Sequence, residues 1–204
     1  MAERSKWKMS DGVQTEGVIG PNAILQLLPQ IEGIGGQAQV ARMLADAGVD
    51  MVPDGSQMIP EGQAARLHQA LRRDAPEMAP LLASEAGHAT ARYILAHRIP
   101  VLAQRALRAL PAGLAARALS RAIAKHAWTF AGSGHFRVVT PWVFEIAQNP
   151  IVRGEHSPIP LCHWHSAVFT QLYQTLVAPD CRCTETACCA VTGHGACRFV
   201  VTRG

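Results

Sequence analysis

The cysteines of this chain are the feature that most limits what it can fold into. All six lie in the last quarter of a 204-residue chain, and the first 161 residues contain none. The six are Cys162, Cys181, Cys183, Cys188, Cys189 and Cys197. Thiolates beside imidazoles and a carboxylate are ligands that Zn²⁺ takes in proteins. The spacing has neither the paired C-x2-C knuckles of a zinc finger nor the C-x2-C-x2-C run of a bacterial iron–sulfur site. The cysteines therefore indicate one site or one small subdomain.

The residues around these cysteines form a recognisable string. It runs Glu185-Thr-Ala-Cys188, then Cys189-x3-Gly193-His194-x2-Cys197-Arg-Phe199, with Cys162 upstream. This string resembles the four-vinyl-reductase domain family, which occurs in bacteriochlorophyll biosynthesis and in the sensor half of phenol-responsive transcription activators. Over its whole length, including residues 7–20 and 158–165, the chain is similar to the bacteriochlorophyll branch.

The resemblance implies a zinc ligand set of an upstream Cys, a Glu, a Cys and a late Cys. Carried over, these are Cys162, Glu185, Cys188 and Cys197. The Glu-to-Cys spacing of three selects Cys188, whereas the Cys-x7-Cys spacing to Cys197 selects Cys189, so both remain candidates. Four ligands leave no open position for catalysis, and we expect a structural zinc that pins the last strands to the helix after Cys162. Alternatively, several of the cysteines are small buried hydrophobic residues.

Composition indicates one well-packed domain over residues 1–204, since 49% of the residues are apolar. We expect an arm over residues 1–20, a helical part over 21–131 and a strand-rich, cysteine-containing part over 132–204. The start of the chain is polar and lacks the apolar region of a signal peptide, and no window is apolar enough to span a membrane. These features predict a cytoplasmic protein whose cysteines are thiols or metal ligands rather than disulfides.

The charges are distributed unevenly. The formal net charge is only +4, but no acidic residue lies between Glu85 and Glu145. The basic residues of that stretch are Arg92, Arg98, Arg105, Arg108, Arg117, Arg121, Lys125 and Arg137. Such a field attracts lipid headgroups, acidic protein surfaces or ligand carboxylates. Nucleic acid is disfavoured, because no helix-turn-helix, zinc finger or aromatic platform accompanies the charges.

The first two thirds of the chain predict successive helices. Residues 22–31 form one with a kink at Pro29, residues 33–36 break the run, and residues 37–47 end at Gly48. Pro60 opens a third helix with Ala64, Leu67 and Leu71 inward, and residues 76–98 form a fourth. Residues 102–126 form two helices separated by Pro111-Ala-Gly113. On the second of these, Arg117, Arg121 and Lys125 share one face.

The fourth helix carries small residues four apart: Ala79, Ala83, Gly87 and Ala91. This strip predicts either close packing of another helix or the wall of a flat ligand. His88 and His97 lie on the same helix about half a turn out of phase, so at most one of them faces any pocket.

After Gly134 the pattern changes to strands. Residues 136–140 and 142–146 predict two strands, a helix follows over residues 161–177, and residues 181–191 and 196–202 predict a hairpin with glycines in its loop. Helices followed by strands indicate an α+β fold with helices packed on an antiparallel sheet. The resemblance implies the same fold, related to vesicle-tethering transport-particle (TRAPP) subunits and phenol-sensor ligand-binding domains, and a homodimer.

The family resemblance directs the functional expectation to tetrapyrroles. We expect a binding or carrier protein for a chlorophyllide- or protochlorophyllide-type intermediate, supporting the 8-vinyl reduction step of bacteriochlorophyll synthesis alongside other pathway enzymes. The candidate ligand-binding residues are His163 and His165 for a magnesium tetrapyrrole, Gly87 and Ala91 for its flat face, and Arg105 and Arg108 for its propionate. At helical spacing His163 and His165 point in different directions.

Two alternatives from other classes stay open. One is a vinyl reductase of divinyl chlorophyllide, but no G-x-G-x-x-G follows a strand, and a side chain cannot supply a hydride, so an external reductant is needed. The catalytic residues of such an enzyme are not identifiable from the sequence. The other is a ligand-sensing or assembly module whose basic face docks a protein or a membrane surface.

Overall fold

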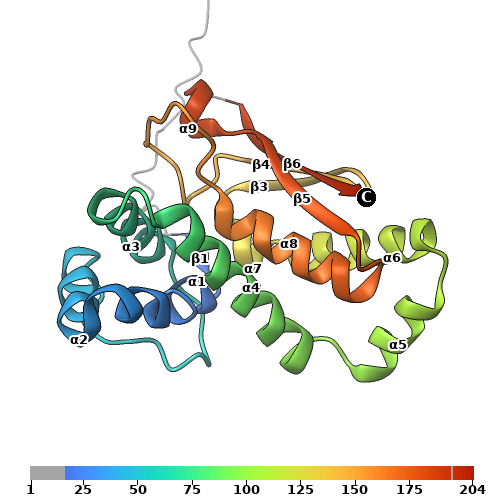
Figure 1. The fold of residues 1–204 in the computed structure, drawn as a ribbon, viewed down its shortest axis with the longest axis horizontal. Helices are drawn as coiled ribbons and strands as arrows, with labels where there is room; N and C mark the ends of the chain where they lie inside the picture. The colour runs from blue at the N-terminus through green and yellow to red at the C-terminus, as the bar shows by residue number, and fades with distance from the viewer. Residues whose placement is uncertain (1–16, 194) are drawn as a thin grey trace, which may run out of the picture.

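The computed structural model describes residues 17–193 and 195–204 and has an α+β architecture, as expected (Figure 1). Its helices are α1 (Asn22–Leu25), α2 (Leu28–Asp46), α3 (Glu61–Asp74), α4 (Ala79–His97), α5 (Val101–Ala109), α6 (Ala112–Lys125), α7 (Trp128–Ala131), α8 (His163–Leu176) and α9 (Cys189–Thr192). Its strands are β1 (Val18–Ile19), β2 (Ile59–Pro60), β3 (His135–Thr140), β4 (Val143–Ala147), β5 (Cys181–Ala187) and β6 (Ala196–Arg203).

The main sheet is antiparallel, with the strand order β3-β4-β6-β5. Strand β6 lies between β4 and β5 and pairs Cys197 with Ile146 on β4 and Phe199 with Glu185 on β5. Helix α8 packs under this sheet, and α4 packs against α8 on the side away from it (Figure 1). The result is a layered molecule in which α8 is covered on both sides, which explains why eight of its residues are buried.

Aromatic side chains fill the space between α8 and the sheet. Phe169 of α8 contacts Phe144 of β4 and Phe199 of β6, with ring centroids 5.0 and 5.4 Å apart. Tyr173 is fully buried, and its hydroxyl donates a hydrogen bond to the carbonyl oxygen of Pro141. Aromatic pairs in these edge and tilted arrangements add to the free energy gained by burying their surface. These contacts fix the distance between α8 and the sheet and therefore the position of the first turn of α8.

Helix α4 lies close to α8 because of the small-residue strip. A Cβ atom on Gly87 would lie 2.4 Å from the carbonyl oxygen of Trp164 and 2.7 Å from the Cβ of Ala167. Both distances are below the closest approach of real carbon side chains, so only glycine fits there. Of the two interpretations of the strip, close packing of another helix is therefore the one that the structure shows.

Three sequence expectations need correction. Pro29 does not kink a helix; it lies in the first turn of α2, where its missing N–H leaves no hydrogen bond unmade, and the chain bends before it. In the same helix, a bend at Gly36, whose φ of 65° is non-helical, agrees with the predicted break in the glycine-rich run.

The other two corrections concern element bounds. The fourth helix begins at Ala79 rather than at Pro76. The expected strand over residues 181–191 ends at Ala187, after which residues 189–192 form the short helix α9.

The hairpin loop behaves as predicted. Gly193 and Gly195 have φ values of 71° and 85°, a region that glycine adopts without steric penalty. Gly48, two residues after the end of α2, also has a positive φ, of 66°. Trp7 and the rest of residues 1–16 lie outside the described part of the chain.

Candidate functional site

Four donor groups converge at the edge of the main sheet, and we call them the cysteine corner: Cys162, Glu185, Cys188 and Cys197. One ligand atom from each lies within 4.8 Å of the others. Cys162 is the residue before α8, Glu185 is near the end of β5, Cys188 follows β5 and Cys197 is on β6. The register of β5 and β6 shifts between Glu185 and Ala187, and this bulge reorients the end of β5. The corner thus joins the helix to the last two strands.

The corner is buried, and its environment favours the ionised form of one of its thiols. Cys162, Cys188 and Cys197 are at most 1% exposed. Hydrogen bonds from the thiols of Cys162 and Cys197 hold the pKa of Cys188 far below its ordinary value, which favours its thiolate. Burial raises the pKa of the Cys162 thiol, and burial raises the pKa of Glu185 to about 8. Removing anions from water is unfavourable, so this arrangement would be stabilised by a cation at its centre.

The orientation of Glu185 supports that conclusion. Its Oε2 accepts a hydrogen bond of 2.7 Å from the backbone N–H of Cys162, whereas its buried Oε1 has no hydrogen-bond partner among the described residues. An unpaired buried carboxylate oxygen costs free energy unless something binds it. Three sulfur atoms and one carboxylate oxygen are a donor set that fits tetrahedral Zn²⁺.

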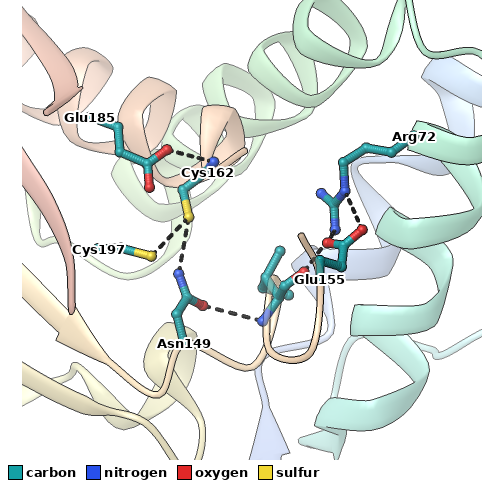
Figure 2. A network of polar contacts seen from close by, with 7 residues as sticks. Arg72, Asn149, Glu155, Cys162, Glu185 and Cys197 are labelled. Carbon is teal, nitrogen blue, oxygen red and sulfur yellow. Dashed lines mark hydrogen bonds and ion pairs between the residues drawn. The ribbon is translucent and has the colours of Figure 1, made fainter. Parts of the chain in front are cut away.

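A second set of polar contacts connects the corner to the helical part (Figure 2). The side-chain amide of Asn149 donates to the sulfur of Cys162 at 3.3 Å and accepts from the backbone N–H of Ile151 at 3.2 Å. The guanidinium of Arg72 on α3 donates to the carbonyl oxygen of Ile151 at 2.8 Å and pairs with Glu155. Metal ligands are often oriented by such neighbours. Asn149 was not identified from the sequence, because nothing in its local pattern predicts a contact with Cys162.

The remaining cysteines lie outside this cluster. The sulfur of Cys189 lies 3.5 Å from the carbonyl oxygen of Gly195, and Cys189 contributes only its backbone N–H to Cys197. Between the two adjacent candidates, the geometry therefore favours Cys188 as the ligand. Cys181 is buried at the start of β5, and burial raises the pKa of Cys183 to about 12.

A separate cavity of about 380 Å³ lies on the other side of α8, between α4, α6, α7 and the segments around residues 20–23 and 55–58. Its inner wall is aromatic and aliphatic, with Trp164, Phe169 and Leu119 each no more than 3% exposed. The indole N–H of Trp164 donates to Thr90 at 3.1 Å, so this polar group of the wall is paired. A concave, mostly apolar space of this size is typical of small-molecule sites.

His165 lines this cavity and is 1% exposed. Burial lowers its pKa to about 4, so the imidazole is neutral at neutral pH. Its Nε2 lies 3.3 Å from the carbonyl oxygen of Phe130, and its Nδ1 has no hydrogen-bond partner among the described residues. A neutral imidazole with one free nitrogen can bind a metal ion or accept a hydrogen bond.

Polar and exposed side chains border the cavity. Arg98 follows α4, and His126 and Trp128 flank the start of α7; all three are exposed and line the cavity. The Arg98 guanidinium lies 5.9 Å from the ring centroid of Tyr93 and forms no ion pair with a described carboxylate. An unpaired cation next to an apolar wall suits a ligand with an apolar body and an acidic end.

The structure separates the residues that the sequence grouped as ligand-binding. Of the expected ligand-binding residues, His165 alone lines the cavity. His163 lies in a depression with Glu185 and Cys183 on the other side of α8, as helical spacing predicted. Gly87 and Ala91 are covered by packing and are absent from the cavity wall, and Arg105 and Arg108 are exposed on α5. The arginine that lines the cavity is Arg98 instead. The sequence marked it only as one basic residue of the acid-free stretch.

No helix among the described residues is long and apolar enough to cross a membrane.

Comparison with known proteins places this geometry in a family. Residues 142–203, which contain the cysteine corner, match a family described as V4R domain. The bacteriochlorophyll synthase 23 kDa chain of Cereibacter sphaeroides is 59% identical over 183 residues, covering 89% of this chain and 88% of that relative. Its namesake from Rhodobacter capsulatus is 47% identical over 185 residues, covering 90% of this chain and 86% of the relative.

Two solved structures share the fold at low sequence identity. An H-NOX protein from S. oneidensis in the Fe(II)NO ligation state has a TM-score of 0.57 and 11% identity, covering 91% of this chain and 99% of that one. An Fe(II) unliganded H-NOX mutant from K. algicida has a TM-score of 0.53 and 9% identity, covering 91% and 97%. The described elements therefore adopt a fold that occurs in solved proteins over their whole length.

Proposed function

This chain belongs to the family of the bacteriochlorophyll synthase 23 kDa chains, and from that membership we propose that it acts in bacteriochlorophyll biosynthesis as a binding or carrier protein for a chlorophyllide-type tetrapyrrole. In this role it holds or delivers the pigment and supports the 8-vinyl reduction step. The observation that carries the proposal is the apolar cavity with a buried neutral His165 and an unpaired Arg98 at its border.

Each part of the cavity corresponds to a part of such a pigment. A tetrapyrrole macrocycle is broad, flat and apolar, and the aromatic wall around Trp164 and Phe169 offers a surface of the same kind. The pigment's central Mg²⁺ takes an axial ligand, which the free Nδ1 of His165 supplies in our proposal. The propionate is an anion, for which Arg98 is the nearest matching group on the cavity border.

We propose that the cysteine corner binds a structural zinc ion. Bound there by Cys162, Glu185, Cys188 and Cys197, the metal would join the start of α8 to β5 and β6 and neutralise their buried charge. Because α8 also forms the cavity wall, this site would hold the wall in position without meeting the pigment. The two sites then have distinct roles, one structural and one in ligand binding.

Binding is favoured over intrinsic reduction by the architecture. The sheet that the described residues form is antiparallel, and nucleotide cofactors are typically held at the carboxyl ends of parallel strands in βαβ units. A vinyl reduction adds two electrons and two protons, and no side chain of this chain can donate a hydride. Reduction would thus require an external reductant or a partner enzyme.

The test is a titration of the purified protein with a divinyl magnesium tetrapyrrole, with and without a reduced nicotinamide, followed by absorption spectroscopy. We expect a shift of the pigment bands at saturation and no conversion of the vinyl group. His165→Ala should reduce this shift, while His163→Ala serves as the matched control from the same helix turn. Stoichiometric conversion to the monovinyl pigment would establish the reductase alternative instead. No spectral change at all would leave ligand sensing of another compound or protein assembly as the function.

A further inference from the structure

Helix α5 has no fully buried side chain, and its Leu107 packs only partly buried against the core. Val101 is 61% exposed and Leu102 is 77% exposed, and Leu110 directly after the helix is 41% exposed. At 100° per residue, Val101, Leu102 and Arg105 fall on one face. Exposed aliphatic residues that occur singly are normal, but Val101 and Leu102 are adjacent at the start of one short helix. This apolar face has no partner among the described residues.

Helix α6 adds positive charge to the same region. Its buried residues occupy one side, and its exposed side carries Leu114, Arg117, Arg121 and Lys125. Leu114 is 52% exposed. None of the three cations pairs with a described carboxylate, and the stretch between Glu85 and Glu145 contains no acidic residue. Helices α5 and α6 extend from the end of α4 at the side of the molecule away from α2 and α3 (Figure 1).

The cavity border continues into this region. Arg98 and Ile99 line the cavity and are followed within two residues by Val101, the first residue of α5. Trp128, which also lines the cavity, is 55% exposed and lies three residues after Lys125 at the end of α6. A tryptophan beside cations and exposed aliphatic side chains is a composition typical of membrane-interface segments.

We propose that the α5–α6 segment docks on an anionic lipid surface. Such a surface provides both kinds of contact at once: acyl chains for Val101, Leu102 and Leu114, and negative headgroups for the arginines and Lys125. An acidic protein patch would neutralise the cations but would leave the aliphatic side chains against polar groups. Docking in this way would turn the border of the cavity toward the bilayer, where an amphipathic ligand can enter or leave.

The experiment is flotation of the ligand-free full chain with vesicles. One set contains phosphatidylcholine alone and the other contains phosphatidylcholine with phosphatidylglycerol. We expect binding to the anionic vesicles at low salt, weaker binding at high salt, and little binding to the neutral vesicles. Leu102→Glu combined with Arg105→Glu should lower the partition coefficient by about tenfold or more, because it removes one apolar contact, adds one negative charge and reverses one positive charge.

The matched control is Leu81→Glu combined with Arg182→Glu. Leu81 is 54% exposed on α4 and Arg182 is exposed on β5, so this variant has the same change of charge outside the proposed surface. Both variants should unfold at the temperature of the wild type. The proposal is overturned if the wild type does not float with anionic vesicles, or if the two double variants lose binding equally. Binding to polyglutamate without flotation would instead identify an acidic protein as the partner. Because no pigment is present, the result does not depend on the proposed pigment binding.

Discussion

The cysteine corner and the cavity lie on opposite sides of α8 and are built by different means. In the corner, each donor is fixed by backbone: the residue before a helix, the end of a strand, and a position in a strand register. The cavity, by contrast, is the space left between α4, α6, α7 and α8, whose side chains do not fill it. The corner is small and sulfur-rich, whereas the cavity is larger and apolar. This difference teaches that one site is specified by residue type and spacing and the other by tertiary packing.

The largest expected effect comes from removing one cysteine of the corner, compared with removing a cysteine that lies outside it. Cys197→Ala should lose the bound zinc, about one ion per chain in the wild type, and lower the free energy of unfolding by about 3 kcal/mol or more. Cys189→Ala is the matched control, because its sulfur lies outside the four-donor cluster. Metal analysis of protein prepared without chelator, together with thermal unfolding, measures both. Absence of zinc from the wild type would remove the metal site, and equal losses in the two variants would remove the assignment to Cys188.

A second prediction concerns pH and the helical side of the molecule. Burial, followed by the nearby charge of Arg72, lowers the pKa of His68 to about 3, and its Nε2 lies 3.1 Å from the carbonyl oxygen of Ala23. The unfolded chain has the ordinary histidine pKa of about 6.5 and binds a proton first. The contribution of His68 to the free energy of unfolding is therefore fully present above about pH 6.5 and is lost as the pH falls toward 3. The loss should amount to about 3 kcal/mol at pH 4.

Chemical unfolding between pH 7 and pH 4 tests this prediction. His68→Gln, which keeps a side-chain donor, should flatten the loss of stability on acidification. His135→Gln changes an exposed histidine and should leave the slope as in the wild type. An unchanged slope in His68→Gln would show that His68 is not held neutral by burial.

The contact between α4 and α8 provides a third prediction. Gly87→Ala places a Cβ atom against the backbone of Trp164, so it should lower the free energy of unfolding by about 1–3 kcal/mol. Gly113→Ala lies in α6, where a Cβ atom meets no atom within 4 Å, and should raise stability by about 0.5–1 kcal/mol. Opposite signs from the same substitution would confirm the packing. A neutral or stabilising Gly87→Ala would mean that the strip faces open space.

The sequence predicted the two sites to different degrees. The α+β class, the fourth helix and the break in the glycine-rich run at residues 33–36 could be found, because helix periodicity and glycine content are local signals. The donor set of Cys162, Glu185, Cys188 and Cys197, with Cys189 as a further candidate, came instead from the resemblance to a known family. The choice between Cys188 and Cys189 depends on the bulge after Glu185 and on α9, which the hydrophobic pattern does not encode. Gly87 and the small-residue strip predicted that another part of the protein or a ligand comes close to this helix, but not that the neighbour is α8. Arg98 borders the cavity because the end of α4 lines the same space as α6 and α7, a tertiary property that spacing does not contain.

The smallest expected effect is on ligand affinity at the cavity border. Arg98→Gln should weaken binding of a carboxylate-bearing magnesium tetrapyrrole by about tenfold, since one charge-assisted hydrogen bond contributes about 1.5 kcal/mol. Arg105→Gln, an equal change on α5, should leave the affinity unchanged because Arg105 does not line the cavity. Equilibrium titration followed by absorption gives both affinities. A larger loss for Arg105→Gln would return the propionate contact to α5.

The central claim is that the ligand occupies the cavity while the cysteine corner only supports its wall, and a cavity-filling substitution tests it most directly. Val168 lies on α8 and lines the cavity, so Val168→Phe should occupy space that the pigment needs. We measure the absorption shift of a magnesium tetrapyrrole on titration with wild type, Val168→Phe and Cys189→Ala, after confirming that all three fold. The account predicts the shift for wild type and Cys189→Ala and its loss for Val168→Phe. An undiminished shift with Val168→Phe would contradict it.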